Sequence, residues 1–316
     1  GPVPLWDVSD LPDDALVVMS AFMGAPGIVA EKLPSGKGAI DSIRSLEQFL
    51  GEKIDALVPA EIGGMNGVYP VFAASKKQLP LIDADFMGRA FSELHMTTSG
   101  AYGFNVAPMS LSDGLGNNVI LDTKDNLRAE AMARATTINL GGYALIALYP
   151  MRGKVLRQAA IAGSVRHAIS IGRAMNTAKR KEQDPITALC HAAQAEIIFR
   201  GKVHHVERQI ADGKILGKVQ LTGHNGQSAQ MMEIFFQNEY LVAKIGHHIA
   251  VTVPDSIALL ESRTATPVLA DKLFRGLEVV VLGLSASPKW RTPEGLALVS
   301  PAAFGYNIEY DSRRSF

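Results

Sequence analysis

Residues 54–85 read IDALVPAEIGGMNGVYPVFAASKKQLPLIDAD, and this stretch indicates how the first part of the chain folds. A short apolar run, IDALVPAEI, is followed by the helical pattern PVFAASKKQ and by a second apolar run, LPLIDAD. Upstream, Ala15–Phe22 (ALVVMSAF) is continuously apolar and Ala39–Leu50 carries a helical apolar stripe. The order β, α, β, α, β with short connections predicts a largely parallel sheet covered by helices.

The following residues predict further elements of the same domain. Asn117–Thr123 (NNVILDT) and Tyr143–Pro150 (YALIALYP) have the composition of buried strands, and Lys124–Asn139 between them is expected to be a helix. The expected apolar face of this helix carries Leu127, Ala131, Ala135 and Ile138. A long helix is expected from Gly153 to about Arg180, and the charged run KRKEQD at its end is the best hinge candidate.

The pattern changes after this run. Asp184, Pro185 and Ile186 look like the N-cap and first two residues of a short helix. From Ile197 onward, apolar residues recur with period two between Gly, Asn, Asp and Pro, which predicts a mostly antiparallel β domain. The sequence therefore predicts an α/β domain at residues 1–182 and a β-rich domain at residues 183–316.

Composition excludes several classes of function. With 316 residues, of which 47% are hydrophobic, the chain can bury a full core in two domains. Lys plus Arg equals Asp plus Glu at 31 each, which argues against binding to nucleic acid or to an anionic membrane. A lone cysteine, Cys190, excludes an internal disulfide framework, and no apolar run approaches the ~20 residues that span a bilayer. We expect a soluble, cytoplasmic protein.

Polar residues concentrate between Val58 and Thr98, beside the short apolar runs. In open α/β sheets, ligands bind outside the carboxyl ends of the strands, so these side chains lie where a small-molecule site is expected. The candidate residues are Glu61, Gly63, Gly64, Asn66, Asp83, Asp85, Arg89, Glu93, His95, Thr97 and Thr98.

Asp83 and Asp85 are the first candidates for catalysis. Residues two apart in a strand point to the same side, so the two carboxylates could raise the pKa of one of them or jointly hold a divalent cation. Turn formation and helix capping explain such pairs equally well. Arg89 and Glu93 are four apart on an expected helix, and their alternative interpretation is a surface ion pair.

His95 could act as a general base or a metal ligand, and the hydroxyls of Thr97 and Thr98 could hold a polar substrate. The alternative is a partly buried histidine followed by threonines in a turn. Glu61 precedes the pair Gly63 and Gly64, whose N–H groups could approach an anion or a carbonyl closely. A tight strand-to-helix turn is the alternative, and no nucleotide fingerprint is present.

The β-rich domain offers a weaker candidate set. Gln237, Asn238 and Glu239 follow the run MMEIFF and could reach a cleft, or they could form a hairpin turn. The pairs His204/His205 and His247/His248 suggest metal ligands, but adjacent strand residues point to opposite faces and do not chelate together.

Several longer motifs occur in order along nearly the whole chain. They are VPAEIGGMNGVYPVFAA, LIDADFMGRAFSELHMTT, IIFRGKV, FQNEYLVA, TVPD, VLGL, WRTPEGL and PAAFGYNIEY. Together they resemble the proteins catalogued as domain of unknown function 917, also called the S-methyl thiohydantoin desulfurase family. Members of that family begin with a glycine-rich segment of the GTGGGG type upstream of a stretch like GPVPL, so we expect such a segment to precede Gly1 in the natural protein.

The resemblance implies an activity and a set of site residues. It implies hydrolytic attack on a cyclic amide or thioamide ring, and its motifs place Glu61, Gly63, Gly64, Asn66, Asp83, Asp85, Arg89, Glu93, His95, Thr97, Gln237, Asn238 and Glu239 in or near the site. From the chemistry of the residues, we expect catalysis by Asp83, Asp85, His95 and Glu61. We expect substrate contacts from Gly63, Gly64, Asn66, Arg89, Glu93, Thr97, Thr98, Gln237, Asn238 and Glu239. A water activated by a carboxylate, or by a cation on the two aspartates, would attack the ring.

Two other classes of function stay open. The first is a non-catalytic subunit that binds a hydantoinase or oxoprolinase-like partner, because the resemblance implies an association with such proteins. The second is a nucleotide-binding protein, which the α/β half suits but no phosphate motif supports. We expect a homo-oligomer, with a divalent metal as the candidate cofactor.

Overall fold

The chain forms two compact units. The computed structural model describes residues 1–24, 36–211, 214–224, 230–313 and 316. Its contacts divide the chain into Gly1–Arg166 and His167–Phe316, so the division falls inside helix α7 (Ser164–Arg180). The run KRKEQD lies at the end of this helix, later in the chain than the division.

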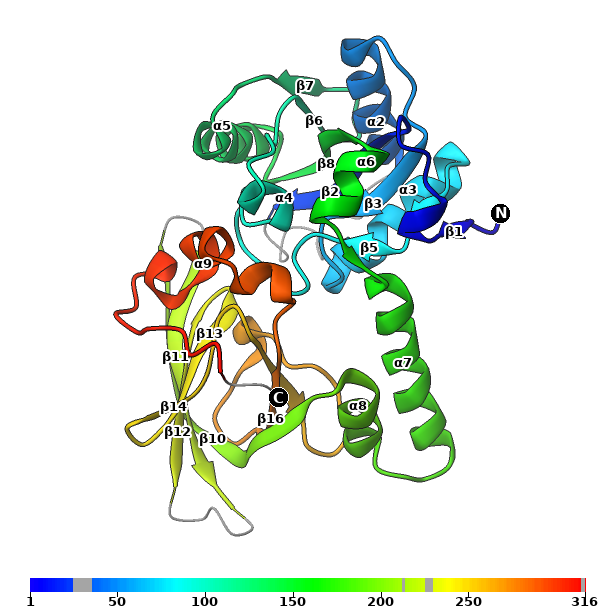
Figure 1. Cartoon of the computed structure of the whole chain (residues 1–316). Coiled ribbons are helices and arrows are strands. Elements are labelled where there is room, and N and C mark those ends of the chain that lie inside the picture. Colours follow the sequence, from blue (N-terminus) through cyan, green and yellow to red (C-terminus); the bar gives the residue numbers. More distant parts are fainter. Residues whose placement is uncertain (25–35, 212–213, 225–229, 314–315) are drawn as a thin grey trace. The chain divides into compact units, whose positions relative to one another are not determined.

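The first unit is an α/β domain (Figure 1). Its strands are β1 (Leu5–Trp6), β2 (Leu16–Gly24), β3 (Ala56–Pro59), β4 (Leu81–Ile82), β5 (Ala84–Asp85), β6 (Met109–Ser112), β7 (Asn118–Leu121), β8 (Tyr143–Arg152) and β9 (Ile161–Ala162). Its helices are α2 (Lys37–Leu50), α3 (Tyr69–Lys77), α4 (Thr98–Ala101), α5 (Asn126–Asn139), α6 (Gly153–Ala159) and the start of α7. Short 3₁₀ helices lie at Val8–Asp10 and Gly64–Gly67.

Seven strands form the main sheet, in the order β1-β4-β3-β2-β8-β6-β7. Strands β1, β4, β3 and β2 pair in parallel, with Val17 opposite Ala56 in β3. Strand β8 lies antiparallel between β2 and β6, so it occupies an interior position in the sheet although it comes late in the chain. The mostly parallel sheet predicted from the sequence is confirmed.

Helices cover both faces of this sheet because successive strand residues point to opposite sides. Val17 and Met19 belong to a buried cluster that includes Ala129 and Ala133 of α5. Leu16 and Val18 belong to the opposite cluster, with residues of α2 and α3. Burial on both faces explains why these strands read as continuous apolar runs rather than as alternating ones.

Helix α5 shows where periodicity alone was wrong. Leu127 and Ile138, expected on the buried face, are 64% and 70% exposed. The buried face instead carries Ala129, Glu130, Ala133 and Thr137. Glu130 accepts hydrogen bonds from the Leu94 N–H at 2.8 Å and from Arg134, so this carboxylate must face inward. Its polar contacts set the rotation of the helix.

The continuous helix expected from Gly153 to Arg180 was also wrong. It is two helices, α6 and α7, separated by strand β9. Gly163 has φ +80, a left-handed conformation that interrupts a right-handed helix. Strand β9 pairs with β5, with Asp85 opposite Ile161, so the interruption brings the start of α7 beside the predicted aspartates.

The second unit is an antiparallel β domain that follows α8 (Pro185–Ala193). Its strands are β10 (Glu196–Ala211), β11 (Lys214–Gly223), β12 (Met231–Gln237), β13 (Glu239–Ile245), β14 (His248–Thr252), β15 (Ser256–Glu261) and β16 (Glu278–Leu284). Short 3₁₀ helices lie at Ala270–Lys272, Pro288–Arg291 and Pro301–Phe304, and α9 spans Pro293–Val299. Asp184 caps α8 as predicted, accepting from the N–H groups of Ile186 and Thr187.

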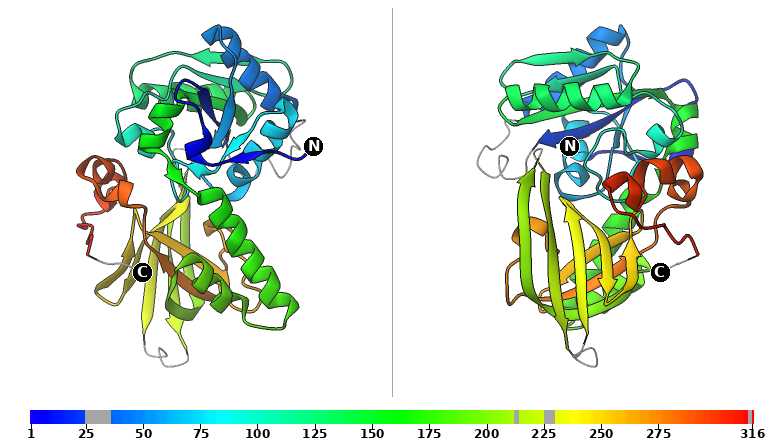
Figure 2. Two further views of the ribbon diagram at one scale, coloured as in Figure 1. Left: turned by 45° about the vertical axis from the view of Figure 1, so that its right-hand side comes forward. Right: turned by 90° about the vertical axis from the view of Figure 1, so that its left-hand side faces the viewer.

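The seven strands of this unit form one curved sheet in the order β14-β13-β12-β11-β10-β16-β15 (Figure 2). Every pairing is antiparallel, which confirms the predicted β-rich domain. A core that includes Phe199 and Phe236 fills one face. On the other face, Ile186 and Leu189 of α8 pack with Val280 of β16.

Three separate motifs of the sequence meet at one buried carboxylate, Asp255, which is 2% exposed. Its Oδ1 accepts hydrogen bonds from the Ala286 N–H at 2.7 Å and from the Tyr310 hydroxyl at 3.1 Å. Arg291 Nη2 lies 3.4 Å from the same oxygen. We call these four residues the Asp255 network. It ties the C-terminal segment to the start of β15.

Candidate functional site

The candidate site lies in the first unit, where the parallel strands end. Strands β2, β3 and β4 point the same way, so their last residues, Gly24, Pro59 and Ile82, lie at one edge of the sheet. Asp83 follows β4 directly, and Asp85 ends β5. The predicted edge and the observed edge are the same.

Asp85 lies at this edge and is fully buried. Burial raises the pKa of Asp85 to about 6, although hydrogen bonds from nearby backbone N–H groups and the Ser164 hydroxyl act to lower it. Oδ2 accepts from the Gly88 N–H at 2.7 Å and the Met87 N–H at 3.4 Å. Oδ1 has no partner at the distance and angle of a normal hydrogen bond among the residues that the structure describes. This oxygen can therefore accept a proton.

The raised pKa of Asp85 predicts a dependence of stability on pH. Because the folded state binds this proton more tightly than the unfolded state, protonated Asp85 stabilises the fold. This contribution is complete below the ordinary value of 3.8 and is lost as the pH rises through about 6. The shift is worth about 3 kcal/mol. We expect the unfolding free energy of the wild type, minus that of Asp85→Asn, to fall by about this amount between pH 4 and 8 in denaturant titrations. A difference that does not change with pH would contradict the assignment.

Asp83 has a different set of contacts. Its Oδ1 accepts the backbone N–H of Arg166 at 3.0 Å, and its Oδ2 lies 2.6 Å from Arg166 Nη1. The same guanidinium contacts Asp7. The Asp83 carboxylate thus caps the first turn of α7, the capping role that the sequence left open for such a pair. Both predicted aspartates meet the start of α7, but through different residues, Arg166 for Asp83 and Ser164 for Asp85.

The loop after β3 is held by Asn66. Its Oδ1 accepts the Phe22 N–H at 2.7 Å, and its Nδ2 donates to Glu61 Oε1 at 2.7 Å. Gly63 and Gly64 lie between these two residues, and a Cβ at either position would have open space around it. Gly64 also has φ +48, which favours glycine. The glycine pair presents bare backbone beside Ile62, whose N–H approaches Asp85.

The segment after Asp85 is not the helix that the spacing of Arg89 and Glu93 suggested. Residues 86–97 form turns and bends. Gly88 has φ +69, a left-handed conformation that cannot continue a right-handed helix, so the turn made by Asp85 with the N–H groups of Met87 and Gly88 does not extend into one. Arg89 lies over the ring of Phe91, 5.2 Å from its centroid.

His95 is 8% exposed within this segment. Its Nε2 lies 3.6 Å from Glu93 Oε2, so the Glu93 side chain is directed at the imidazole. Its Nδ1 is buried and makes no hydrogen bond to the described part of the chain. The imidazole therefore has one nitrogen beside a carboxylate and one without a hydrogen-bond partner among the described residues.

Thr97 and Thr98 fix this turn in place. Thr98 donates both its N–H and its hydroxyl to the Phe86 carbonyl, the residue next to Asp85. Thr97 Oγ1 accepts the Gly100 N–H and donates to the Tyr149 hydroxyl of β8. Gly100 is required here because a Cβ would lie 2.3 Å from the His95 carbonyl. These contacts favour the structural alternative for both threonines, and substrate binding by them stays a prediction.

Gln237, Asn238 and Glu239 belong to the second unit and form the turn between β12 and β13, the hairpin left open by the sequence. Asn238 has φ +59 and exchanges hydrogen bonds with Ile215. Gln237 Nε2 donates to the Phe304 carbonyl at 2.8 Å.

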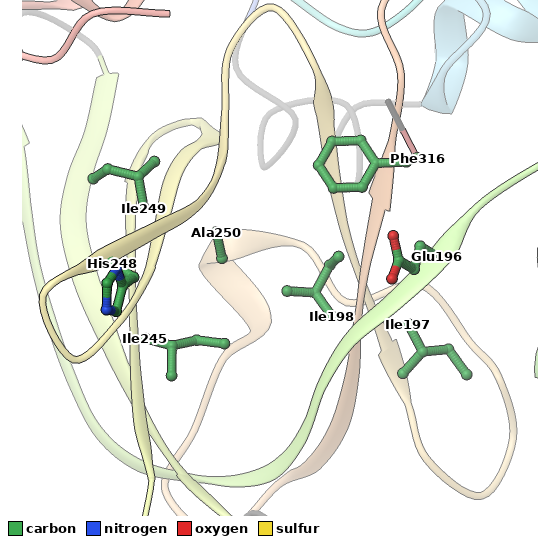
Figure 3. Close-up of a pocket in the computed structure, with 8 residues that line it drawn as sticks. All are labelled: Glu196, Ile197, Ile198, Ile245, His248, Ile249, Ala250 and Phe316. Carbon is green, nitrogen blue, oxygen red and sulfur yellow. The ribbon is translucent and has the colours of Figure 1, made fainter. Parts of the chain in front are cut away.

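A hollow of about 400 Å³ also lies in this unit, away from the predicted residues (Figure 3). Figure 3 shows Ile198 and Ile245 pointing toward each other across it, with Glu196 and His248 as its ionisable residues.

Sequence reasoning missed Ser164 and Tyr149, which contact the site from outside the Val58–Thr98 stretch. Neither has a sequence signal, because Ser164 lay inside an expected helix and Tyr149 inside a strand.

Within the described ranges, no group of three or more His, Cys, Asp or Glu side chains is placed to hold a metal ion. The divalent metal stays a prediction. No helix of the described residues has both the length and the apolar character needed to cross a membrane.

Comparison with solved structures supports the fold. A protein from Chromobacterium violaceum, solved by X-ray crystallography, matches with a TM-score of 0.81 and 24% identity. The match covers 98% of this chain and 87% of that one. At this identity the likeness shows the fold alone. No curated protein matches the chain.

Family models cover almost every residue. The model described as "S-Me-THD-like, N-terminal domain" matches residues 1–123, and "S-Me-THD-like, C-terminal domain" matches residues 124–313. The border between them falls before α5, so α5, β8 and α6 complete the first compact unit from within the second model. The chain belongs to the S-Me-THD-like family.

Proposed function

We propose that the chain hydrolyses an S-methyl thiohydantoin-type ring, with Asp85 as the general base. The observation that carries the proposal is the buried Asp85 carboxyl, whose pKa is raised to about 6. A general base works best when its pKa lies near the operating pH, and a carboxylate in water is too weak for this role. Family membership supports a thiohydantoin-related substrate.

The reaction needs one water and no redox partner. Asp85 Oδ1 takes a proton from water while the water oxygen bonds to the ring carbon that carries sulfur. The bond from this carbon to sulfur then breaks. The departing thiolate takes the proton from Asp85 and leaves as a thiol. The second water hydrogen ends on the ring nitrogen, so the products are a hydantoin and a thiol.

The neighbouring residues supply binding and charge. The bare backbone at Gly63 and Gly64 gives a flat ring room to approach beside Ile62. Glu61 is oriented by Asn66 and can accept from a ring N–H. His95 or Arg89 stabilises the charge that develops on the ring during attack.

Turnover by the natural gene product, including any segment upstream of Gly1, tests the proposal. The panel holds S-methyl thiohydantoins, hydantoins and small lactams, read by ring absorbance and released thiol. We expect thiol release from the first class, with kcat/KM rising with pH through about 6 because Asp85 must be ionised.

Silence on the whole panel with divalent metals supplied would overturn the proposal. If turnover appeared only after addition of a hydantoinase or oxoprolinase-like protein, and survived Asp85→Asn, the chain would be an accessory subunit instead.

A further inference from the structure

A second hollow in the β-rich unit has the chemistry of an anion site. It measures about 470 Å³ and lies apart from the hollow of Figure 3. Its lining residues are Lys202, Val203, His204, Thr222, Arg275 and Gly276. Three of these six carry basic side chains, and none is acidic.

Strand pairing builds this hollow from segments far apart in the sequence. Lys202 of β10 lies opposite Thr222 of β11. The loop before β16 is tied to the same part of β10, because Gly276 N–H donates to the Val203 carbonyl at 2.8 Å. This loop carries Arg275 to the hollow.

Two local irregularities shape the lining. The register of β10 shifts between Val203 and His205, a bulge that redirects the side chain of His204. Gly276 has φ +97, a conformation that other residues rarely adopt. Bulges and left-handed glycines of this kind occur where a strand edge is shaped for binding.

The basic side chains of this hollow lack carboxylate partners among the described residues. In the parts of the chain that the structure describes, Lys202, His204 and Arg275 form no ion pair. Glu278 is the cross-strand neighbour of Lys202 on β16, yet the two side chains do not pair. The Thr222 hydroxyl has only a long contact of 3.4 Å to the Lys202 carbonyl, so it can turn toward a ligand.

We propose that this hollow binds a small oxyanion, the phosphate or carboxylate group of a small molecule. Lys202 and Arg275 supply charged donors. The planar guanidinium of Arg275 can donate two parallel hydrogen bonds to two oxygens of one group. Thr222 supplies a neutral donor. The formal net charge of the chain is +0, so the attraction is local to the hollow rather than a property of the whole surface. The site is independent of the thiohydantoin activity.

Titration of the whole chain with inorganic phosphate and, separately, with succinate tests the site. Amide chemical shifts of Val203, Thr222 and Gly276 are followed by NMR at constant ionic strength. We expect saturable shifts at these amides below about 20 mM ligand. The anion that binds more tightly tells whether the site prefers phosphate or carboxylate.

Three variants that each remove one positive charge test whether binding occurs at this hollow. Arg275→Gln and Lys202→Gln should each weaken binding at least about tenfold, because each removes a charged donor. Lys272→Gln is the control, since Lys272 is 72% exposed, pairs with Asp271 and does not line the hollow. It should change binding less than about twofold. Failure of both anions to saturate, or equal weakening by all three variants, would overturn the proposal.

Discussion

Asp85→Asn should lower turnover of the S-methyl thiohydantoin substrate by at least about 100-fold, the usual contribution of a general base. The variant keeps the size of the side chain and an oxygen for the N–H groups of Met87 and Gly88. It removes the atom that accepts the proton from water. The effect should appear in kcat rather than KM, because the proton moves only in the transition state.

Two controls separate this loss from unfolding. Asp125→Asn changes an exposed aspartate in the same unit, where asparagine caps a helix equally well, so turnover should not change. The melting temperature of Asp85→Asn at pH 8 should not fall below that of the wild type, because a buried charge has been removed. Full turnover in a folded Asp85→Asn would exclude Asp85 as the base.

Asp255→Ala should destabilise the β-rich unit by about 3 kcal/mol, because it leaves the partly buried Arg291 without its carboxylate. Arg291 Nε is already buried with no hydrogen bond to the described residues, so the loss of the carboxylate would leave a second donor group of this guanidinium unsatisfied. For a unit of this size, we expect the corresponding thermal transition to fall by about 6–12 °C in calorimetry.

Two further variants, with smaller expected losses of stability, provide a comparison for Asp255→Ala. Tyr310→Phe removes one hydrogen bond from the Asp255 network and should cost about 1 kcal/mol. Asp311→Ala, at the exposed neighbouring position, should cost at most about 0.5 kcal/mol. If Asp255→Ala and Asp311→Ala had the same melting temperature, the Asp255 network would not stabilise the unit.

The sheets were predictable because their signals are local. Runs such as Ala15–Phe22 are buried on both faces, and the residues after Ile197 alternate with period two. Neither pattern depends on contacts between distant parts of the chain. The edge carrying Asp83 and Asp85 followed from the same reasoning, since parallel strands place their carboxyl ends together.

The failures have a common physical cause. The orientation of α5 depends on Glu130, whose partner Leu94 is 36 residues away in the chain. The hydrogen-bond partners of Asp85 also include both residues that are near in the sequence and one that is distant. Met87 and Gly88 are local, whereas Ser164 reaches the carboxyl only because α7 starts anew after Gly163. Long-range polar contacts leave no periodic trace in a sequence.

The position of β8 has a consequence for synthesis on the ribosome. This strand separates β2 from β6, so residues 1–123 emerge with two strands that lack their shared neighbour. Unpaired strand edges of this kind attract other chains. The nascent protein must therefore protect these edges until Tyr143–Arg152 has been translated, and only then can the first unit close its sheet.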